Sequence, residues 1–244
     1  GEEVIVSRVY RFFGIGESHL EERLKDLIQN QGNPTVAPLA MEAEVTLRLT
    51  AKASSESEAE KLIEPVRQQI FERLGGFYYG EGDLSLEKLV VRRLLEQKRT
   101  LGLAESCTGG LITRMLTTVP GSSGAVKGGV VSYTSEVKEG LLGIPSGVIE
   151  RFGAVSMETA LAMADCAREL LDSDLALSVT GVAGPDPMEG KPVGLVYIGC
   201  AEKGLPTRAY RIRLAGNRQA IQLRAAKYAL FILQERLKKG ETRT

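Results

Sequence analysis

The segment Thr100-Leu-Gly-Leu-Ala-Glu-Ser-Cys-Thr-Gly-Gly110 has the pattern of a buried strand followed by a tight turn that opens a helix. Its first half is a short apolar run, which is typical of a strand covered on both faces. The hydroxyl residues Ser106 and Thr108 lie in the turn. Gly109 and Gly110 follow, and glycine tolerates the backbone angles of tight turns. We therefore predict a strand, a turn and a helix here, the unit from which layered α/β sheets are built.

The same alternation extends on both sides of this segment. We predict helices from Ser85 to about Lys98, from Glu136, over 156–171 and over 218–238, and strands over 129–133, 175–180, 193–201 and 208–214. Helices that alternate with strands predict a three-layer α/β domain over residues 84–244. The last two strands are adjacent in the sequence, so we expect a mixed sheet.

Residues 1–83 predict a second, smaller α/β domain. We expect a strand over 4–13, a helix over 18–30 closed by Asn33-Pro34, a strand over 43–51, a helix over 54–75 and then the aromatic run 77–79. Pro65 lies inside the last helix and predicts a kink or a boundary there. Residues 80–83 are expected to form the linker to the larger domain.

The composition excludes several classes of protein. The 244 residues carry 31 Lys plus Arg and 31 Asp plus Glu, and no apolar stretch reaches the roughly 20 residues of a membrane-spanning helix. No secretory leader opens the sequence, so we expect a soluble, cytoplasmic protein without a membrane partner. The chain begins at Gly1 without an initiator Met, which suggests that an upstream domain is missing.

Cysteine and histidine are too few for the common metal sites. Cys107, Cys166 and Cys200 are an odd number at wide spacings, which argues against disulfides and a cysteine zinc site. His19 is the only histidine, so a Ser-His-Asp triad would depend on it entirely. We expect no metal and no cofactor, and proton transfer must use other groups.

Charge is distributed unevenly between the two predicted domains. Residues 1–83 hold 9 basic and 15 acidic residues, and the remainder has the opposite excess. An acidic domain is unsuited to nucleic acid, because neutralisation of phosphates dominates that affinity. Arg236, Lys238 and their neighbours in the C-terminal tail are interpreted as solubilising charges.

The first of three candidate loops is the turn 105–110. Ligands of open α/β sheets bind beyond the carboxyl ends of strands, and backbone N–H groups at the start of a helix suit a phosphate or an oxyanion. Ser106 beside such donors could act as an acyl-transfer nucleophile. Alternatively, Ser106 and Thr108 only cap the helix. Cys107 is a second possible nucleophile, although a small packing residue fits its apolar surroundings better.

The second and third loops offer a base and further ligand contacts. Lys138 stands in the first turn of a helix, where burial and the helix dipole would lower its pKa and let the neutral amine act as a general base. A solvated lysine is the alternative. Tyr133 could orient a substrate or pack in the core. Thr180 and Gly181 open a glycine-rich turn suited to close approach by a ligand, and Arg218 could bind an anion or remain a surface charge.

Six motifs occur in one order along the larger domain. They are ESCTGG (105–110), GGVVSYTSEVKEGLLGI (128–144), FGAVS (152–156), SVTGVAGP (178–185), KPVGLVYIG (191–199) and GNR-x5-R (216–224). In this succession they resemble the C-terminal domain of the CinA (competence/damage-inducible) family, which is a nicotinamide mononucleotide (NMN) deamidase. FFGIGES, NPTVAP and VTLRLTA in residues 1–83 resemble the KH-like middle domain of that family. The family's N-terminal domain, similar to molybdopterin-binding proteins, is expected to be absent.

The resemblance implies a Ser/Lys amidase that converts NMN and water to nicotinate mononucleotide and ammonia without a cofactor. Ser106 matches the nucleophile and Lys138 the general base. Tyr133, Thr180, Gly181 and Arg218 match substrate-binding positions, and the backbone of Cys107, Thr108, Gly109 and Gly110 would form the oxyanion hole. Ser135 departs from the Asn common in the family.

Two alternative functions and an oligomeric state also follow from the sequence. A nucleic-acid-binding scaffold is the first alternative, but RNA-clamping KH domains use a GXXG loop between helices, and none lies at the helix junction of residues 1–83. A sensor of phosphate ligands without turnover is the second. We expect a homodimer that binds NMN and no nucleic acid.

Overall fold

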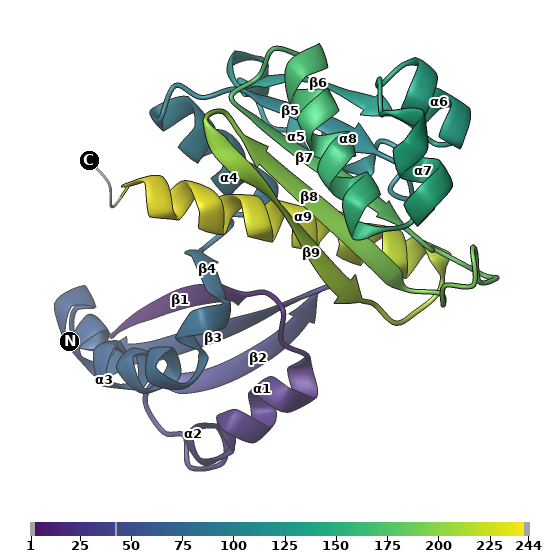
Figure 1. The fold of residues 1–244 in the computed structure, drawn as a ribbon. Coiled ribbons are helices and arrows are strands. Elements are labelled where there is room, and N and C mark those ends of the chain that lie inside the picture. Colours follow the sequence, from purple (N-terminus) through teal and green to yellow (C-terminus); the bar gives the residue numbers. More distant parts are fainter. Residues whose placement is uncertain (1–2, 42, 242–244) are drawn as a thin grey trace. The chain divides into compact units, whose positions relative to one another are not determined.

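The computed structural model describes residues 3–41 and 43–241 (Figure 1). Backbone contacts divide the chain into two compact units, Gly1–Ser85 and Leu86–Thr244. We call them the small unit and the large unit and treat each by itself.

The small unit is a four-stranded antiparallel sheet with helices (Figure 1). Its elements are β1 (Val4–Phe12), α1 (Glu17–Arg23), α2 (Lys25–Gln29), β2 (Thr35–Met41), β3 (Glu44–Ala53), α3 (Glu56–Leu74), the short 3-10 helix Gly75–Phe77 and β4 (Tyr78–Glu81). The strand order is β2-β3-β1-β4. Helix α3 packs on β1 and β3, and the core between them includes Phe12, Leu47 and Ile63, all at most 1% exposed.

In the small unit, one predicted helix is wrong, one of two predicted alternatives is excluded, and one strand was missed. The helix predicted over 18–30 is two helices, because the buried Leu24 has a non-helical backbone (φ −109°, ψ 12°) between them. Of the two alternatives predicted at Pro65, a kink or a boundary, the boundary is excluded because helix α3 continues through this residue. Burial of the apolar face of the helix outweighs the hydrogen bond that proline removes. Strand β2 was not predicted, because it is an edge strand with one buried residue, Val36, and a proline, Pro38.

The large unit contains a five-stranded sheet in the order β6-β5-β7-β8-β9. Its elements are α4 (Leu86–Glu96), β5 (Leu101–Glu105), α5 (Leu111–Thr117), a 3-10 turn (Ser122–Gly124), β6 (Val126–Val131), α6 (Ser135–Gly140), α7 (Ser146–Phe152), α8 (Met157–Leu170), β7 (Leu175–Gly181), β8 (Leu195–Glu202), β9 (Leu205–Arg213) and α9 (Arg218–Glu241). Strand β5 is parallel to β6 and β7, whereas β8 is antiparallel to β7 and β9, so the predicted mixed sheet is confirmed.

Helices cover both faces of this sheet, which confirms the three-layer prediction (Figure 1). Helix α8 packs across β5, β7 and β8 on one face, and α9 packs on β7 and β8 from the other, beside α4 and α5. All seven residues of β7 are buried. A central strand covered on both faces is a rigid base for the loops at its carboxyl end. Helix α7 was not predicted.

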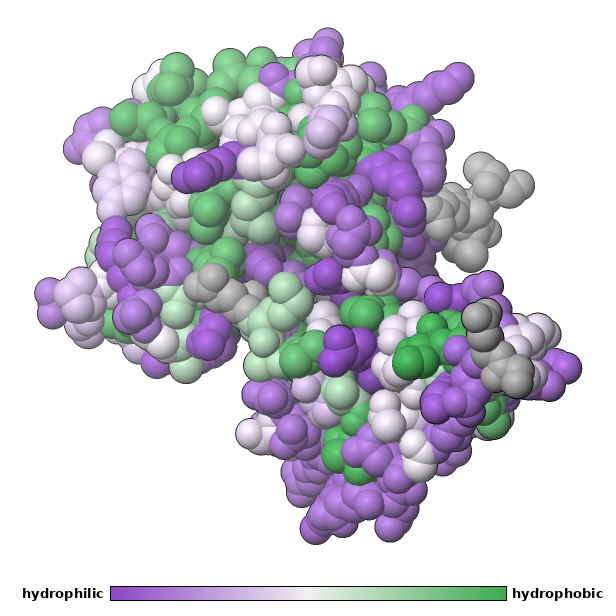
Figure 2. Space-filling view, turned by 180° about the vertical axis from the view of Figure 1, so that it is seen from behind, coloured by the Kyte–Doolittle hydropathy of each residue, from purple (hydrophilic) through white to green (hydrophobic). Residues whose placement is uncertain are grey.

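Within the described ranges, no helix combines the length and the apolar character that crossing a bilayer requires. Figure 2 shows hydrophobic residues interspersed among hydrophilic ones on the face of the large unit that it presents.

Candidate active site

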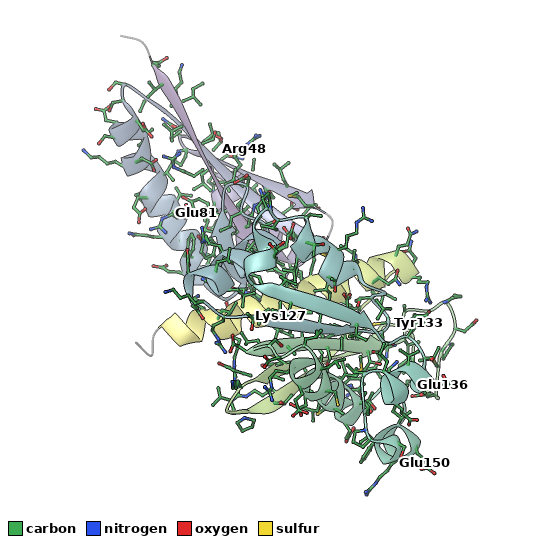
Figure 3. The ribbon with its side chains drawn as sticks, turned by 90° about the horizontal axis from the view of Figure 1, so that it is seen from above. Arg48, Glu81, Lys127, Tyr133, Glu136 and Glu150 are labelled. Atoms are coloured by element: carbon green, nitrogen blue, oxygen red, sulfur yellow. The ribbon has the colours of Figure 1, made fainter. Side chains whose placement is uncertain are left out.

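Three neighbouring strands of the large unit lead to one edge of the sheet. Strand β5 ends at Glu105, and its parallel neighbours β6 and β7 end beside it, since Glu105 pairs with Val131 and with Val179. Figure 3 shows Lys127 near the start of β6 and Tyr133 beyond its end. The candidate residues from three distant parts of the sequence therefore meet at this edge, as expected for the carboxyl ends of parallel strands.

The side chains of Ser106 and Lys138 are in direct contact. Nζ of Lys138 lies 3.0 Å from Oγ of Ser106, within hydrogen-bond distance. Both residues are buried, Lys138 with 1% of its surface exposed. A fully buried lysine is rare and needs polar partners. The alternative of a solvated lysine is therefore wrong.

Two backbone carbonyls hold the Lys138 amine in place. Nζ donates to the carbonyl oxygen of Ser132 at 2.8 Å and to that of Tyr133 at 3.3 Å. A neutral amine has two N–H bonds and one lone pair. The two N–H bonds can point at the carbonyls, which leaves the lone pair for the hydroxyl proton of Ser106. Once protonated, the ammonium still finds an acceptor for each of its three N–H bonds.

Burial lowers the pKa of Lys138 from its ordinary value of 10.5. The negative charge that Cys107 would carry as a thiolate and the carboxylate of Glu189 oppose this shift without reversing it. A lysine with a lowered pKa is neutral in a larger fraction of molecules near neutral pH, which is the state that a general base needs.

The turn after β5 contains backbone N–H groups without a backbone partner among the described residues. Gly109 and Gly110 have φ of +59° and +97°, values that favour glycine. The N–H of Gly109 donates to the carbonyl of Ser106 at 3.0 Å. The N–H groups of Cys107, Thr108 and Gly110 make no hydrogen bond to any residue in the described part of the chain. The predicted oxyanion hole is thus corrected at Gly109, whose N–H is already used, whereas three donors remain.

The capping role belongs to Glu105, which the sequence analysis overlooked. This fully buried carboxylate accepts hydrogen bonds at 2.9 Å from the N–H groups of Ile112 and Thr113, and at 2.7 Å from the Thr113 hydroxyl. Ser106 is therefore not needed to cap α5, and the Thr108 hydroxyl has no hydrogen-bond partner among the described residues. The available signal was an acidic residue just before a helix start.

Cys107 is a poor nucleophile here. Its thiol is buried, and this burial raises its pKa to about 12, so it stays protonated at neutral pH. Its backbone carbonyl accepts a hydrogen bond of 2.9 Å from Nε2 of Gln222 on α9, which ties the turn to the long helix. The structure thus agrees with a packing role for the Cys107 side chain.

A cavity opens in front of Ser106. Its wall is formed by residues from the loops that follow β5, β6 and β7, from the last residue of β7 and from the start of α9: Ser106, Cys107, Tyr133, Gly181, Val182, Ala183, Gly184, Asp186, Met188 and Arg218. Arg218 donates to the hydroxyl of Tyr133 at 2.8 Å and to the carbonyl of Gly184. Tyr133 is 56% exposed and lies outside β6, so its alternative as a core residue is wrong.

The cavity includes Gly181 but not Thr180. A Cβ at Gly181 would lie 2.8 Å from the carbonyl of Leu195, so glycine is required where β7 ends. Thr180 is buried, and its hydroxyl donates to the carbonyl of Ala154 at 2.7 Å. The structure therefore gives Thr180 a position behind the cavity wall, where it supports a neighbouring turn.

The structure also gives the positions of Ser135 and His19. Ser135 begins α6, behind the N-cap residue Thr134. His19 lies on α1 of the small unit. Among the described residues, no group of three or more His, Cys, Asp or Glu side chains could hold a metal ion.

Comparison with known proteins assigns both units to one family. The model of the CinA C-terminal domain matches residues 83–237, and that of the damage-inducible protein CinA KH domain matches residues 7–80. The chain belongs to the CinA family.

Curated relatives and solved structures agree with this assignment. Relatives named competence-damage inducible protein are 52% identical in Geobacillus sp. (strain WCH70) and 48% identical in Bacillus anthracis, each over 96% of this chain. The chain spans 56% and 57% of their lengths. A CinA-superfamily structure from Klebsiella pneumoniae is 29% identical (TM-score 0.61, covering 63% of this chain and 96% of that one). A competence/damage-inducible protein from Agrobacterium tumefaciens is 36% identical (TM-score 0.59, 63% and 95%).

Proposed function

We propose that the large unit is an amidohydrolase that converts NMN and water to nicotinate mononucleotide and ammonia. The observation that carries the proposal is the 3.0 Å contact between Ser106 Oγ and the buried Lys138 Nζ beside a cavity. A serine next to a base, with backbone donors at hand, is the arrangement that covalent acyl transfer needs. The substrate itself comes from the family resemblance.

In the first half of the reaction, Ser106 becomes acylated. Neutral Lys138 takes the hydroxyl proton of Ser106 while Oγ attacks the carboxamide carbon, and the C=O electron pair moves onto oxygen. The resulting oxyanion would be bound by the free N–H groups of Cys107, Thr108 and Gly110. When the tetrahedral intermediate collapses, the C–N bond breaks, the nitrogen takes the proton from the Lys138 ammonium, and ammonia leaves. Lys138 is then neutral again.

In the second half, water releases the acid. Lys138 removes a proton from a water molecule, whose oxygen attacks the ester carbon of acylated Ser106. Collapse of this second intermediate breaks the bond to Oγ, which regains its proton from Lys138. The products are nicotinate mononucleotide and the starting form of the enzyme. One amine serves as base and acid in both halves, so every proton is accounted for.

Arg218 supports the choice of a nucleotide. Its guanidinium lines the cavity, and a planar cation with several N–H donors suits a phosphate. Its partner Tyr133 presents an aromatic ring at the cavity wall, next to which a pyridine ring could lie. In this arrangement the phosphate would lie toward α9 and the carboxamide toward Ser106.

Incubation of the purified chain with NMN, without added metal, tests the proposal. Ammonia and nicotinate mononucleotide should form in equal amounts with the wild type, and neither Ser106→Ala nor Lys138→Ala should produce them at a measurable rate. A wild type that binds NMN but releases no ammonia would contradict the proposed function and favour a phosphate-ligand sensor.

A further inference from the structure

The FGAVS segment, residues 152–156, has no role in the mechanism above, yet side chains from elsewhere bind its backbone. It forms the turn between α7 and α8. Oε1 of Glu189 accepts a hydrogen bond of 2.8 Å from the N–H of Ala154, and Oε2 accepts one of 3.1 Å from the N–H of Val155. Glu189 thereby satisfies two consecutive backbone donors that the turn leaves unpaired.

Lys191 and Gly153 complete this contact. Nζ of Lys191 lies 3.2 Å from Oε2 of Glu189 and donates to the carbonyl of Phe152, also at 3.2 Å. Gly153 has φ of +85°, and a Cβ there would lie 2.4 Å from Oε2 of Glu189. Any other residue at position 153 would be strained and would displace the carboxylate. Glycine at position 153 therefore leaves the space that the Glu189 carboxylate occupies.

The turn is anchored to the sheet on its other side. The Ala154 carbonyl accepts from Thr180 at the end of β7, and the Gly153 carbonyl accepts from Thr159 of α8 at 2.6 Å. The 152–156 turn is thus a fixed support, and Glu189 attaches a more exposed segment to it.

The attached segment contains part of the cavity wall. Asp186 and Met188 line the cavity, and Glu189 follows directly. Met188 and Lys191 exchange two backbone hydrogen bonds of 3.1 and 2.8 Å, which closes a tight reversal with Glu189 and Gly190 at its tip. Because Glu189 holds the tip, the position of the wall depends on this carboxylate.

The negative charge of Glu189 also acts to raise the pKa of Lys138. The groups whose charges act on Lys138 are the Cys107 thiol from the β5–α5 turn and the Glu189 carboxylate from this loop. The thiol is neutral at ordinary pH, since burial raises its pKa. Glu136 lies on α6 with Lys138, but it is exposed (Figure 3). Glu189 is consequently the carboxylate that favours the protonated state of Lys138, the state formed when Ser106 loses its proton.

We propose that Glu189 is a positioning residue of the active site, which fixes the Asp186–Met188 wall against the FGAVS turn. This proposal deepens the proposed function and rests on it for its kinetic consequences. Its structural part, the attachment of the loop, stands on the hydrogen bonds alone.

The variant Glu189→Gln tests this positioning role without removing a buried apolar side chain. The amide has one acceptor oxygen, so it can bind one of the two N–H groups and loses the pairing with Lys191. We expect KM for NMN to rise at least ten-fold with a smaller change in kcat, because the wall binds substrate away from the reacting atoms. Loss of the negative charge should also move the acidic limb of the kcat/KM profile to lower pH, since Lys138 then loses its proton more readily.

Glu136→Gln is the matched control, because it removes one carboxylate near Lys138 in the sequence without touching the loop. Both variants and the wild type are compared by hydrogen-exchange mass spectrometry and by the pH dependence of ammonia release from NMN. Glu189→Gln should accelerate exchange in residues 182–194 and 152–156 and leave the β7 and β8 peptides unchanged, and Glu136→Gln should match the wild type.

Two different outcomes distinguish the two proposals. Exchange in Glu189→Gln at the wild-type rate in both segments, or an unchanged KM and pH profile in an active enzyme, would overturn the role of Glu189. If the wild type releases no ammonia, the proposed function fails instead, and the exchange data still decide whether Glu189 holds the loop.

Discussion

Replacement of Lys138 by methionine tests the base most selectively. Methionine has a similar length and suits a residue that is 1% exposed, but it has no nitrogen to accept the Ser106 proton. Proton transfer by a positioned base is worth about 10² to 10⁴ in rate. We expect kcat to fall by at least 10²-fold, which corresponds to about 2.7 kcal/mol of transition-state stabilisation.

The structure also bounds the effect of this change on folding. The carbonyls of Ser132 and Tyr133 lose the donor that Nζ provides. Leaving a buried polar group unpaired costs about 1–3 kcal/mol. Removal of a buried amine, whose protonated form is poorly solvated, offsets part of that cost. Circular dichroism should therefore show a folded protein with a modestly changed unfolding midpoint.

Lys138→Arg is the matched control for charge. A guanidinium keeps the positive charge but cannot be deprotonated, so this variant should be as inactive as Lys138→Met. Ammonia release from NMN is measured for both variants at equal enzyme concentration. A folded Lys138→Met variant that retains more than a tenth of the wild-type kcat would refute the assignment of Lys138 as the base.

Three further predictions concern neighbours of the dyad. Cys107→Ala should keep activity within about three-fold of the wild type. The wild type should resist iodoacetamide at pH 7, because burial raises the pKa of the thiol to about 12. Rapid inactivation by iodoacetamide would contradict a protonated, unreactive thiol. Arg218→Lys should raise KM for NMN at least ten-fold, because a lysine cannot bind a phosphate in a bidentate manner; an unchanged KM in steady-state assays would place the phosphate elsewhere. Glu105→Gln should lower the free energy of unfolding by about 1–3 kcal/mol in urea titrations, since the amide cannot accept all three hydrogen bonds at the start of α5. An unchanged free energy of unfolding would argue against the capping role of Glu105.

Much of the large unit could be predicted because its strands are continuous and buried. The run that ends at Glu105 and the fully buried β7 are apolar enough to be recognised without tertiary information. Ser106 follows the first of these strands and Gly181 ends the second, and both line the cavity, as expected for a ligand site at the carboxyl ends of strands. Local sequence therefore located the edge of the sheet at which the candidate site lies.

Features that depend on tertiary packing could not be predicted. Pro65 predicts a kink or a boundary in its helix, and only the buried face of α3 explains why the helix continues. Leu24 interrupts a pattern that is periodic on either side, and β2 has too few buried residues to show alternation. In each case a contact with a distant part of the small unit decides the local structure.

The hydrogen-bond partners of side chains at the site could not be predicted from the sequence either. Thr180 looked like a ligand contact because it opens a glycine-rich turn, but its hydroxyl is committed to Ala154. Glu189 looked like part of an exposed connection, and nothing local indicates that it binds a turn 34 residues earlier in the chain. The contact between Ser106 and Lys138, which are 32 residues apart in the chain, likewise depends on the tertiary fold.

The central claim is that Ser106 carries the acyl group between two chemical steps. Turnover of NMN in the presence of increasing hydroxylamine tests it most directly, because a nucleophilic amine intercepts an ester intermediate. We predict that the hydroxamate of nicotinate mononucleotide forms in proportion to hydroxylamine, at the expense of the free acid, while ammonia release is not slowed. Ammonia release with free acid as the sole product at every hydroxylamine concentration would contradict an acyl-enzyme on Ser106.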